Sequence, residues 1–339
     1  MAAPKIFLTG GTGYIGGDAL YRIHEAHPDW EITALVRNSD RGAVIASKYP
    51  TVNLVYGSLN SADVIEEEAK KADIVYHFAN CDHVASARAI AKGLAAHTSD
   101  RPGHWIHISG TGSLVFEDLR AFRIGELRDK EYNDWDGVGE LTSLPDDAPH
   151  RNVDKIVIDV GSNAADRVKT AIISPPAIYG PGRGPGNTRS VQVYNLARAV
   201  LRRRKGFLVG KGENIWHEVH VHDLSDLSLA LGEAAVAGGG KATWGKEGYY
   251  LAENGGFAWG DIQRAVAKVA FEQGFIKSSD VDVLDAMQTS AVDRSGPFLW
   301  GTNSRGQAIR GRKLLDWNPH RPSSFELLPD IVQSEAKYL

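Results

Sequence analysis

The feature that most constrains the fold is a glycine-rich turn near the N-terminus. Residues 6–17 read Ile-Phe-Leu-Thr-Gly-Gly-Thr-Gly-Tyr-Ile-Gly-Gly, an apolar run that breaks into glycines and then into a helical pattern. This order predicts a strand, a tight turn and a helix N-terminus whose free N–H groups bind phosphate. Gly10 would allow the sharp turn, Gly13 a close approach of pyrophosphate, and Gly16 close packing of helix on strand. We therefore expect a dinucleotide site here.

The end of the next expected strand bears on which dinucleotide binds. Residues 31–36 form an apolar run typical of a buried parallel strand, and Arg37 follows it. An acid at this place would bind the ribose hydroxyls of NAD(H), whereas an arginine accommodates the 2′-phosphate of NADP(H). Arg41 is near, and no acid lies between the strand end and Asp40. The sequence favours NADP(H), because guanidinium pairs well with phosphate. The alternative is that Arg37 is a solvated strand-end charge.

Length, charge and cysteine content limit the class of protein. The 339 residues suffice for one large α/β domain or two lobes. The net charge of −4 gives no basic footprint for nucleic acid. The single cysteine, Cys81, excludes an internal disulfide and fits a reducing compartment. The apolar run at residues 6–8 is too short for a signal or a membrane span. We expect a cytoplasmic protein with a small-molecule substrate, bound to neither nucleic acid nor membrane, and leave a homodimer open.

Three segments far apart in the chain carry a family resemblance. The GxxGxxG spacing, with Thr9, Tyr14 and Ile15 around it, resembles the extended and atypical short-chain dehydrogenase/reductases, which include the epimerase/dehydratase-like and NmrA-like proteins. Residues 175–182, Pro-Pro-Ala-Ile-Tyr-Gly-Pro-Gly, resemble the family element that packs beside the nicotinamide. Residues 315–319, Leu-Asp-Trp-Asn-Pro, resemble its closing signature. The resemblance covers essentially the whole chain.

The resemblance implies an α/β fold, a doubly wound parallel-sheet Rossmann fold with a smaller, mostly helical substrate lobe. It assigns residues 1–180 and about 217–252 to the NADP-binding domain, and about 181–216 and 253–339 to the lobe. Helices are expected from Trp259 and from Ser279. Where relatives carry Gly-Asp-Leu, Ser58 replaces the acid, so only the position is carried over. The expected cofactor contacts are Thr9, Gly10, Gly13, Tyr14, Ile15, Gly16, Arg37, Ser58, Leu59, Phe78, Ala79, Asn80, Ser109, Lys155, Pro175, Pro176 and Ile178.

The catalytic residues of the family are matched only in part. Hydroxyl residues follow the expected strand at 105–108, and the resemblance places the substrate-binding hydroxyl at Thr111. The family also carries a tyrosine and a lysine four apart on one helix face. Lys155 takes the lysine position, where it would hold the nicotinamide ribose, but Arg151 stands where the tyrosine is expected. Tyr132, His150 or Arg151 could donate the proton instead, or no residue here donates one.

Three functions stay open. The leading one is an NADP(H)-dependent oxidoreductase that reduces a carbonyl, imine or activated alkene of a small organic molecule. The second is a redox-neutral, NADP-using epimerase, dehydratase or cyclase of a biosynthetic pathway, which the missing tyrosine favours. The third is a non-catalytic, NmrA-like NADP(H)-sensing regulator, against which the hydroxyl cluster and the long segment 114–149 argue. The alternating His217, His220 and His222 have no carboxylate cluster beside them, and we expect no metal. His77, within a strand, is expected to be structural.

Overall fold

A parallel sheet of seven strands forms the centre of the computed structural model, which describes residues 3–339. The strands are β1 (Lys5–Thr9), β2 (Glu31–Val36), β3 (Asn53–Tyr56), β4 (Ile74–His77), β5 (Gly103–Ile108), β7 (Val168–Ser174) and β11 (Tyr249–Leu251). Their order is β11-β7-β5-β4-β1-β2-β3, and all neighbours are parallel. Chain order runs outward from β1 in both directions, which is the doubly wound arrangement. The predicted fold class is therefore confirmed.

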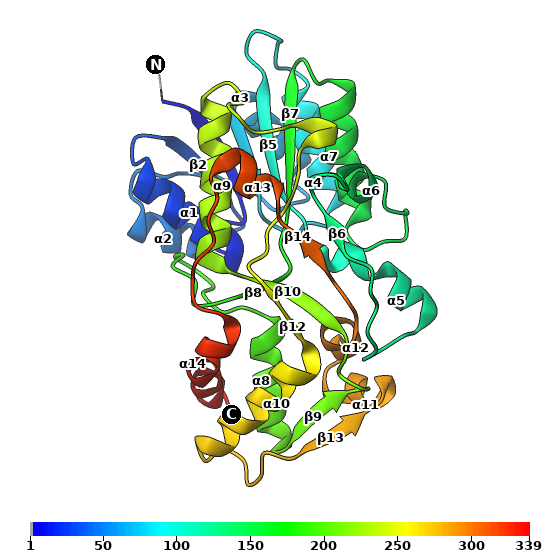
Figure 1. Cartoon of the computed structure of the whole chain (residues 1–339). Coiled ribbons are helices and arrows are strands. Elements are labelled where there is room, and N and C mark those ends of the chain that lie inside the picture. Colours follow the sequence, from blue (N-terminus) through cyan, green and yellow to red (C-terminus); the bar gives the residue numbers. More distant parts are fainter. Residues whose placement is uncertain (1–2) are drawn as a thin grey trace.

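Helices cover both faces of the sheet, as Figure 1 shows. One face carries α1 (Tyr14–Ala26), α2 (Ser39–Lys48) and α9 (Val221–Val236). The other carries α3 (Ala62–Lys71), α4 (Val84–Leu94) and α7 (Arg151–Asn163), which pack side by side. Because both faces are covered, β5 is buried along its whole length. The ligand crevice of such a fold lies at the carboxyl ends of the strands, near β1 and β4.

A second hydrophobic core lies below the sheet in Figure 1. Its largest fully buried side chains are Trp259 and Trp300. Its elements are α8 (Gln192–Arg203), β9 (Gly206–Val209), α10 (Trp259–Glu272), β13 (Val281–Leu284), α11 (Ala286–Val292), α12 (Gly296–Gly301) and α14 (Ser324–Ala336). A small sheet of β8 (Ala177–Tyr179), β10 (Ile215–His220) and β12 (Gly256–Ala258) connects the two halves. The chain then returns to the first core through α13 (Arg310–Leu315) and Trp317.

The segment between residues 109 and 150 is built from short elements. They are η1 (Thr111–Val115), α5 (Phe116–Ala121), β6 (Tyr132–Asn133) and α6 (Val138–Thr142). β6 pairs in parallel with β14 (Gly306–Gln307), so this segment is tied to the C-terminal part of the chain. The turn η2 (Gly245–Glu247) precedes β11.

The helix predicted from Ser279 is wrong. Residues 281–284, Val-Asp-Val-Leu, form β13 and pair in parallel with β9. Their alternating β-branched side chains favour an extended strand. The helix begins only at Ala286, where Asp285 and Gln288 form a capping box. The helix predicted from Trp259 is confirmed as α10.

None of the helices within residues 3–339 combines the length and the apolar character that crossing a membrane requires.

Candidate functional site

The glycine turn after β1 leaves the N-terminus of α1 open. Gly10 has a φ of +85°, and a Cβ atom on it would lie 2.4 Å from the carbonyl oxygen of Phe78. A Cβ atom on Gly16 would lie 2.5 Å from the carbonyl oxygen of Gly10. Both positions therefore require glycine. Gly13 meets only that same oxygen, at 3.1 Å, and no side chain caps the helix. Free backbone N–H groups thus face the space beside the turn, as an anion site requires.

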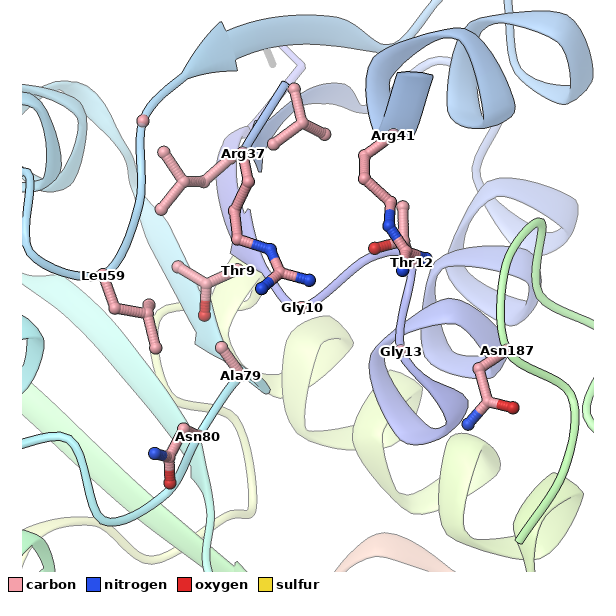
Figure 2. Close-up of a pocket in the computed structure, with 13 residues that line it drawn as sticks. Thr9, Gly10, Thr12, Gly13, Arg37, Arg41, Leu59, Ala79, Asn80 and Asn187 are labelled. Atoms are coloured by element: carbon pink, nitrogen blue, oxygen red, sulfur yellow. The ribbon is translucent and has the colours of Figure 1, made fainter. Parts of the chain in front are cut away.

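A cavity of about 390 Å³ lies over this turn and is shown in Figure 2. The ends of β1, β2, β3 and β4 all contribute to its walls, which places it at the crevice expected for the fold. The lining residues are Thr9, Gly10, Thr12, Gly13, Leu35, Val36, Arg37, Arg41, Gly57, Leu59, Ala79, Asn80 and Asn187.

Two arginines give this cavity its charge. Arg37 and Arg41 are exposed, and their guanidinium groups reach toward Gly10 and Thr12 in Figure 2. Within residues 3–339, no carboxylate forms an ion pair with either of them. Two guanidinium groups without carboxylate partners are free to bind a phosphate.

The segment at residues 180–187 covers the other side of the turn, and the sequence did not reveal this contact. The backbone N–H of Asn187 donates to the carbonyl oxygen of Thr12 at 3.0 Å. A Cβ atom on Gly186 would lie 2.3 Å from that oxygen, and one on Gly184 would lie 2.6 Å from the carbonyl carbon of Gly17. The available signal was a glycine at every second position from 180 to 186, which permits this close approach of two backbones.

A second, smaller cavity of about 240 Å³ lies on the far side of the α1 N-terminus. The Tyr14 hydroxyl donates to the carbonyl oxygen of Gly180 at 2.6 Å and so fixes one wall. The cavity shares the start of α1 and the end of β4 with the first one. Its lining residues are Tyr14, Ile15, Phe78, Pro176, Ile178, Ser190, Val191 and Gln192.

Most of the expected cofactor residues line one of these two cavities. Five do not: Gly16, Ser58, Ser109, Pro175 and Lys155. The Ser58 hydroxyl accepts the N–H of Asn60 in the turn before α3. The Ser109 hydroxyl donates to Asp154 at 2.9 Å. The Pro175 carbonyl oxygen accepts the N–H of Thr111 at 2.9 Å. Gly16 packs against the backbone of Gly10, and the side chain of Lys155 is half-exposed.

His150 lies at the carboxyl end of β5. Its Nδ1 is 2.9 Å from Oδ1 of Asp82 and 3.4 Å from Sγ of Cys81, two residues that follow β4. The opposite edge of its ring faces η1, the turn that follows β5, where a Cβ atom on Gly112 would lie 3.0 Å from Nε2. Glycine at this position therefore makes room for the imidazole ring. The His150 side chain is 21% exposed to solvent.

The partners of His150 favour its charged form. Burial alone would lower the pKa of His150, but the hydrogen bonds to Asp82 and Cys81 and the nearby charge of Asp82 raise that pKa to about 10. The hydrogen bond with His150 in turn lowers the pKa of Asp82. At neutral pH the pair is an imidazolium beside a carboxylate, and a charged imidazole can donate a proton.

The register of α7 decides which side chains face β5. His150 and Asp154 are four residues apart and therefore lie on one helix face, toward Gly112 and Ser109. Lys155 is rotated away from this face, and its half-exposed Nζ pairs with Asp146 at 2.8 Å. Arg151 is buried and donates to the carbonyl oxygen of Thr142. The structure thus does not bring Lys155 or Arg151 to the site. The face of α7 that points to the site carries Asp154, one residue before the lysine that the family resemblance had placed there.

The two remaining catalytic candidates are held in the interior. The Ser304 hydroxyl lies 2.7 Å from Oγ1 and 2.8 Å from the carbonyl oxygen of Thr111. Thr111 is therefore engaged by the C-terminal part of the chain. Tyr132 is buried on β6, where the Lys130 ammonium lies 4.7 Å from its ring centroid. Of the three proposed proton donors, the structure brings only His150 to the ends of β4 and β5.

Comparisons with known proteins agree with this architecture. The NmrA-like family model matches residues 3–97. The chain is 37% identical to the protein named Oxidase ucsJ from an Acremonium species, over 99% of this chain and 98% of that one. The UDP-glucose 4-epimerase of Thermotoga maritima, solved with UDP-glucose, superposes with a TM-score of 0.66 at 14% identity, covering 98% and 99% of the two chains. The dTDP-glucose 4,6-dehydratase of Bacillus anthracis, solved with NAD, gives 0.65 at 14%, covering 99% and 97%.

The doubly wound sheet and the open glycine turn define a Rossmann-type protein. The chain belongs to the extended and atypical short-chain dehydrogenase/reductases, the group of NmrA-like and epimerase/dehydratase-like proteins. The resemblance seen in the sequence motifs is therefore confirmed.

Proposed function

We propose that this protein is an NADP(H)-dependent oxidoreductase that reduces a carbonyl, imine or activated alkene of a small organic molecule. The observation that carries the proposal is the pairing of His150 with Asp82 at the ends of β4 and β5. A reduction needs a proton as well as a hydride, and a histidine held in its charged form supplies one. A protein that only sensed the cofactor would not need such a group. The name of the Acremonium relative, an oxidase, supports redox chemistry.

The residues of the two cavities fit a nicotinamide dinucleotide. The uncapped N-terminus of α1 would hold the pyrophosphate, and Gly10, Gly13 and Gly16 leave room for it. Arg37 and Arg41 would bind a 2′-phosphate, which supports NADP(H) over NAD(H). The second cavity would take the nicotinamide side. When bound, the cofactor supplies the hydride.

The geometry of His150 assigns its two ring nitrogens different tasks. Nδ1 keeps its hydrogen and donates it to Asp82, which holds the ring in place. Nε2, on the edge toward Gly112, is then the nitrogen that gives a proton to the substrate oxygen, nitrogen or carbon. The hydride and this proton together convert the double bond to the reduced product, and His150 is left neutral. It regains its proton before the next turnover.

Activity assays with a matched pair of variants test this proposal. Purified protein is given NADPH and a panel of carbonyls, imines and activated alkenes, and loss of the reduced nicotinamide absorbance is followed. We expect His150→Gln to lower kcat about 100-fold or more, since general acid catalysis contributes roughly that much. NADPH affinity should stay unchanged. His24→Gln, a surface histidine on α1, serves as the control and should match wild type.

Two other outcomes point to the alternative functions. Product formation without net cofactor oxidation would favour a redox-neutral epimerase or dehydratase, the activities named for the structural neighbours. Tight NADPH binding with no turnover of any compound, in wild type and in His150→Gln alike, would contradict an enzyme and favour a cofactor-sensing regulator.

A further inference from the structure

A row of buried polar side chains runs from the end of β5 through the interior to the surface. We infer that this row is a proton relay that joins the active site to solvent. Its members are Ser109, Asp154, His107, His77, Ser86 and His83. The inference rests on the proposed function, because it assigns the row the task of supplying protons to that site.

The inner half of the row begins under the active site. The Ser109 hydroxyl donates to Oδ2 of Asp154 at 2.9 Å. The other carboxylate oxygen, Oδ1, lies 3.6 Å from Nε2 of His107. Both of these atoms are buried, and neither has a hydrogen-bond partner elsewhere in the described chain. Two unsatisfied polar atoms that face each other in this way need only a small closure to form a hydrogen bond.

The outer half crosses from β5 to β4 and then to α4. His107 and His77 are paired in the parallel register of the two strands, and their Nδ1 atoms lie 3.0 Å apart. Nε2 of His77 lies 3.4 Å from the Ser86 hydroxyl, which lies 3.1 Å from Nδ1 of His83. Nε2 of His83 is 3.0 Å from the amide oxygen of the exposed Asn60, so the row ends at solvent.

The row can carry a proton because its hydrogen bonds are consistent in two opposite directions. With Asp154 ionised, Ser86 donates to His77, Nδ1 of His77 donates to His107, and Nε2 of His107 donates to Asp154. With Asp154 protonated, each of these bonds is reversed. In the structure Nδ1 of His83 also accepts the backbone N–H of Ser86 at 3.1 Å. Once a proton taken up at His83 displaces this bond, it arrives at Asp154 when every hydrogen moves to its neighbour. Each group loses one proton and gains one, and no group inside the row ends with a charge.

Burial keeps the two central rings in the form that such a transfer needs. His77 and His107 are completely buried. Desolvation lowers the pKa of His77 to about 3 and lowers that of His107 well below its usual value, so both rings are neutral near pH 7. A neutral imidazole has one donor and one acceptor nitrogen. Asp154 differs, because desolvation raises its pKa to about 7, and it can hold or release a proton there.

The charged and titratable groups around Asp154 are few. His150 and Arg151 on α7 lower its pKa, and Asp82 from the loop after β4 raises it. On the β5 side, Asp154 lies 3.6 Å from His107, and its negative charge helps to raise the pKa of Tyr249 on β11. Asp154 lies one helical turn from His150, and its backbone N–H donates to the carbonyl oxygen of His150 at 3.1 Å. From this position, a proton delivered from the surface would replace the one used in each turnover.

Nuclear magnetic resonance of 15N-histidine-labelled protein tests the path without any substrate or cofactor. We expect His77 and His107 to stay neutral between pH 5 and pH 9 while both change tautomer at one shared midpoint, that of Asp154. Asp154→Asn should abolish the change. His104, a buried histidine of β5 outside the row, should not follow that midpoint. Unchanged tautomers, a charged ring, or two independent midpoints would overturn the relay.

Turnover of two matched variants tests whether the path serves the reaction. His77→Phe interrupts the relay at a completely buried ring, and His104→Phe, at a buried histidine of the neighbouring strand β5, is its control. We expect His77→Phe to lower kcat about tenfold with a larger solvent isotope effect and unchanged KM and NADPH affinity. Equal kcat values for His77→Phe and wild type would overturn the assigned task. If wild type reduces no compound at all, the proposed function fails, while the tautomer measurement still decides whether the path exists.

Discussion

His150 shows how much of the site depends on single residues. It caps α7 with a φ of +66°, in the left-handed region that non-glycine residues seldom adopt. Such conformations persist where the surrounding contacts hold them. Here the contacts are the hydrogen bond to Asp82 on one ring edge and the space left by Gly112 on the other. The same contacts give the residue its charge, so position and protonation have a common origin.

The charge of Asp82 should set the pH range of the reaction. The acid form of His150 is lost as pH rises through its pKa, which its partners raise to about 10. In Asp82→Asn the carboxylate is gone, so burial lowers that pKa and only Cys81 still raises it. We expect the variant to lose activity above about neutral pH, at least a few units earlier than wild type. Parallel pH–rate profiles for the two proteins would contradict the role of Asp82.

The buried Asp154 should make the stability of the protein depend on pH. Its folded-state pKa of about 7 lies above the usual 3.8, so the folded protein binds more protons than the unfolded chain between these values. The free energy of unfolding should therefore fall as pH rises from about 4 to about 7, by up to about 4 kcal/mol for this group. Asp154→Asn should remove that fall, as denaturant unfolding at pH 4.5 and pH 8 would show. The same pH dependence in both proteins would contradict it.

The contact between two glycine-rich segments is the decisive feature at the scale of elements. Residues 180–187 lie against the start of α1. Arg183 adds three hydrogen bonds to the buried Asp18 of that helix, one from its backbone N–H and two from its guanidinium group. The segment therefore closes one side of the space in which a pyrophosphate would lie. Its glycines matter because the two backbones touch.

Gly186→Ala tests this contact. The added Cβ atom would meet the carbonyl oxygen of Thr12 at 2.3 Å, and this backbone atom cannot move away easily. We expect a loss of about 1–3 kcal/mol in stability and weaker NADPH binding. The control is Gly139→Ala in α6, where no atom lies within 4 Å of the new Cβ atom. Thermal unfolding and calorimetry measure both effects, and equal behaviour of the two variants would refute the argument.

At the scale of the whole molecule, the sequence predicted what local patterns encode. The apolar run and glycines of residues 6–17 predicted the strand, the turn and the open helix N-terminus. Residues 31–36 were predicted as a strand and form β2. The helix expected from Ser279 failed because the strand there is stabilised by pairing with β9, a partner that is distant in sequence.

Features that arise from contacts between residues far apart in the chain could not be predicted from the sequence. The face of α7 that meets β5 depends on how residues 111–149 fold. The sequence therefore assigned Lys155 to the site, whereas the structure has Asp154 on that face. His77 and His107 are thirty residues apart, and only the register of β4 and β5 makes them neighbours. Asn187 came to the cavity through the packing of residues 180–187 on the glycine turn.

The preference between cofactors is a property of the assembled first cavity. We expect the double variant Arg37→Ala, Arg41→Ala to bind NADPH about 10- to 100-fold more weakly, because two charge-assisted contacts to phosphate are lost. NADH lacks that phosphate, so its affinity should stay nearly constant and serve as the control. Calorimetry with both cofactors measures the ratio. An equal loss for NADH and NADPH would mean that the arginines do not read the 2′-phosphate.

Transfer of deuterium from NADPH labelled at C4 of the nicotinamide tests the central claim most directly. The wild-type protein is incubated with the labelled cofactor and the substrate panel, and products are analysed by mass spectrometry. We predict a reduced product that carries the deuterium, formed in a one-to-one ratio with oxidised cofactor. Product formed without oxidation of the cofactor, or no deuterated product from any compound, would contradict an NADP(H)-dependent reductase.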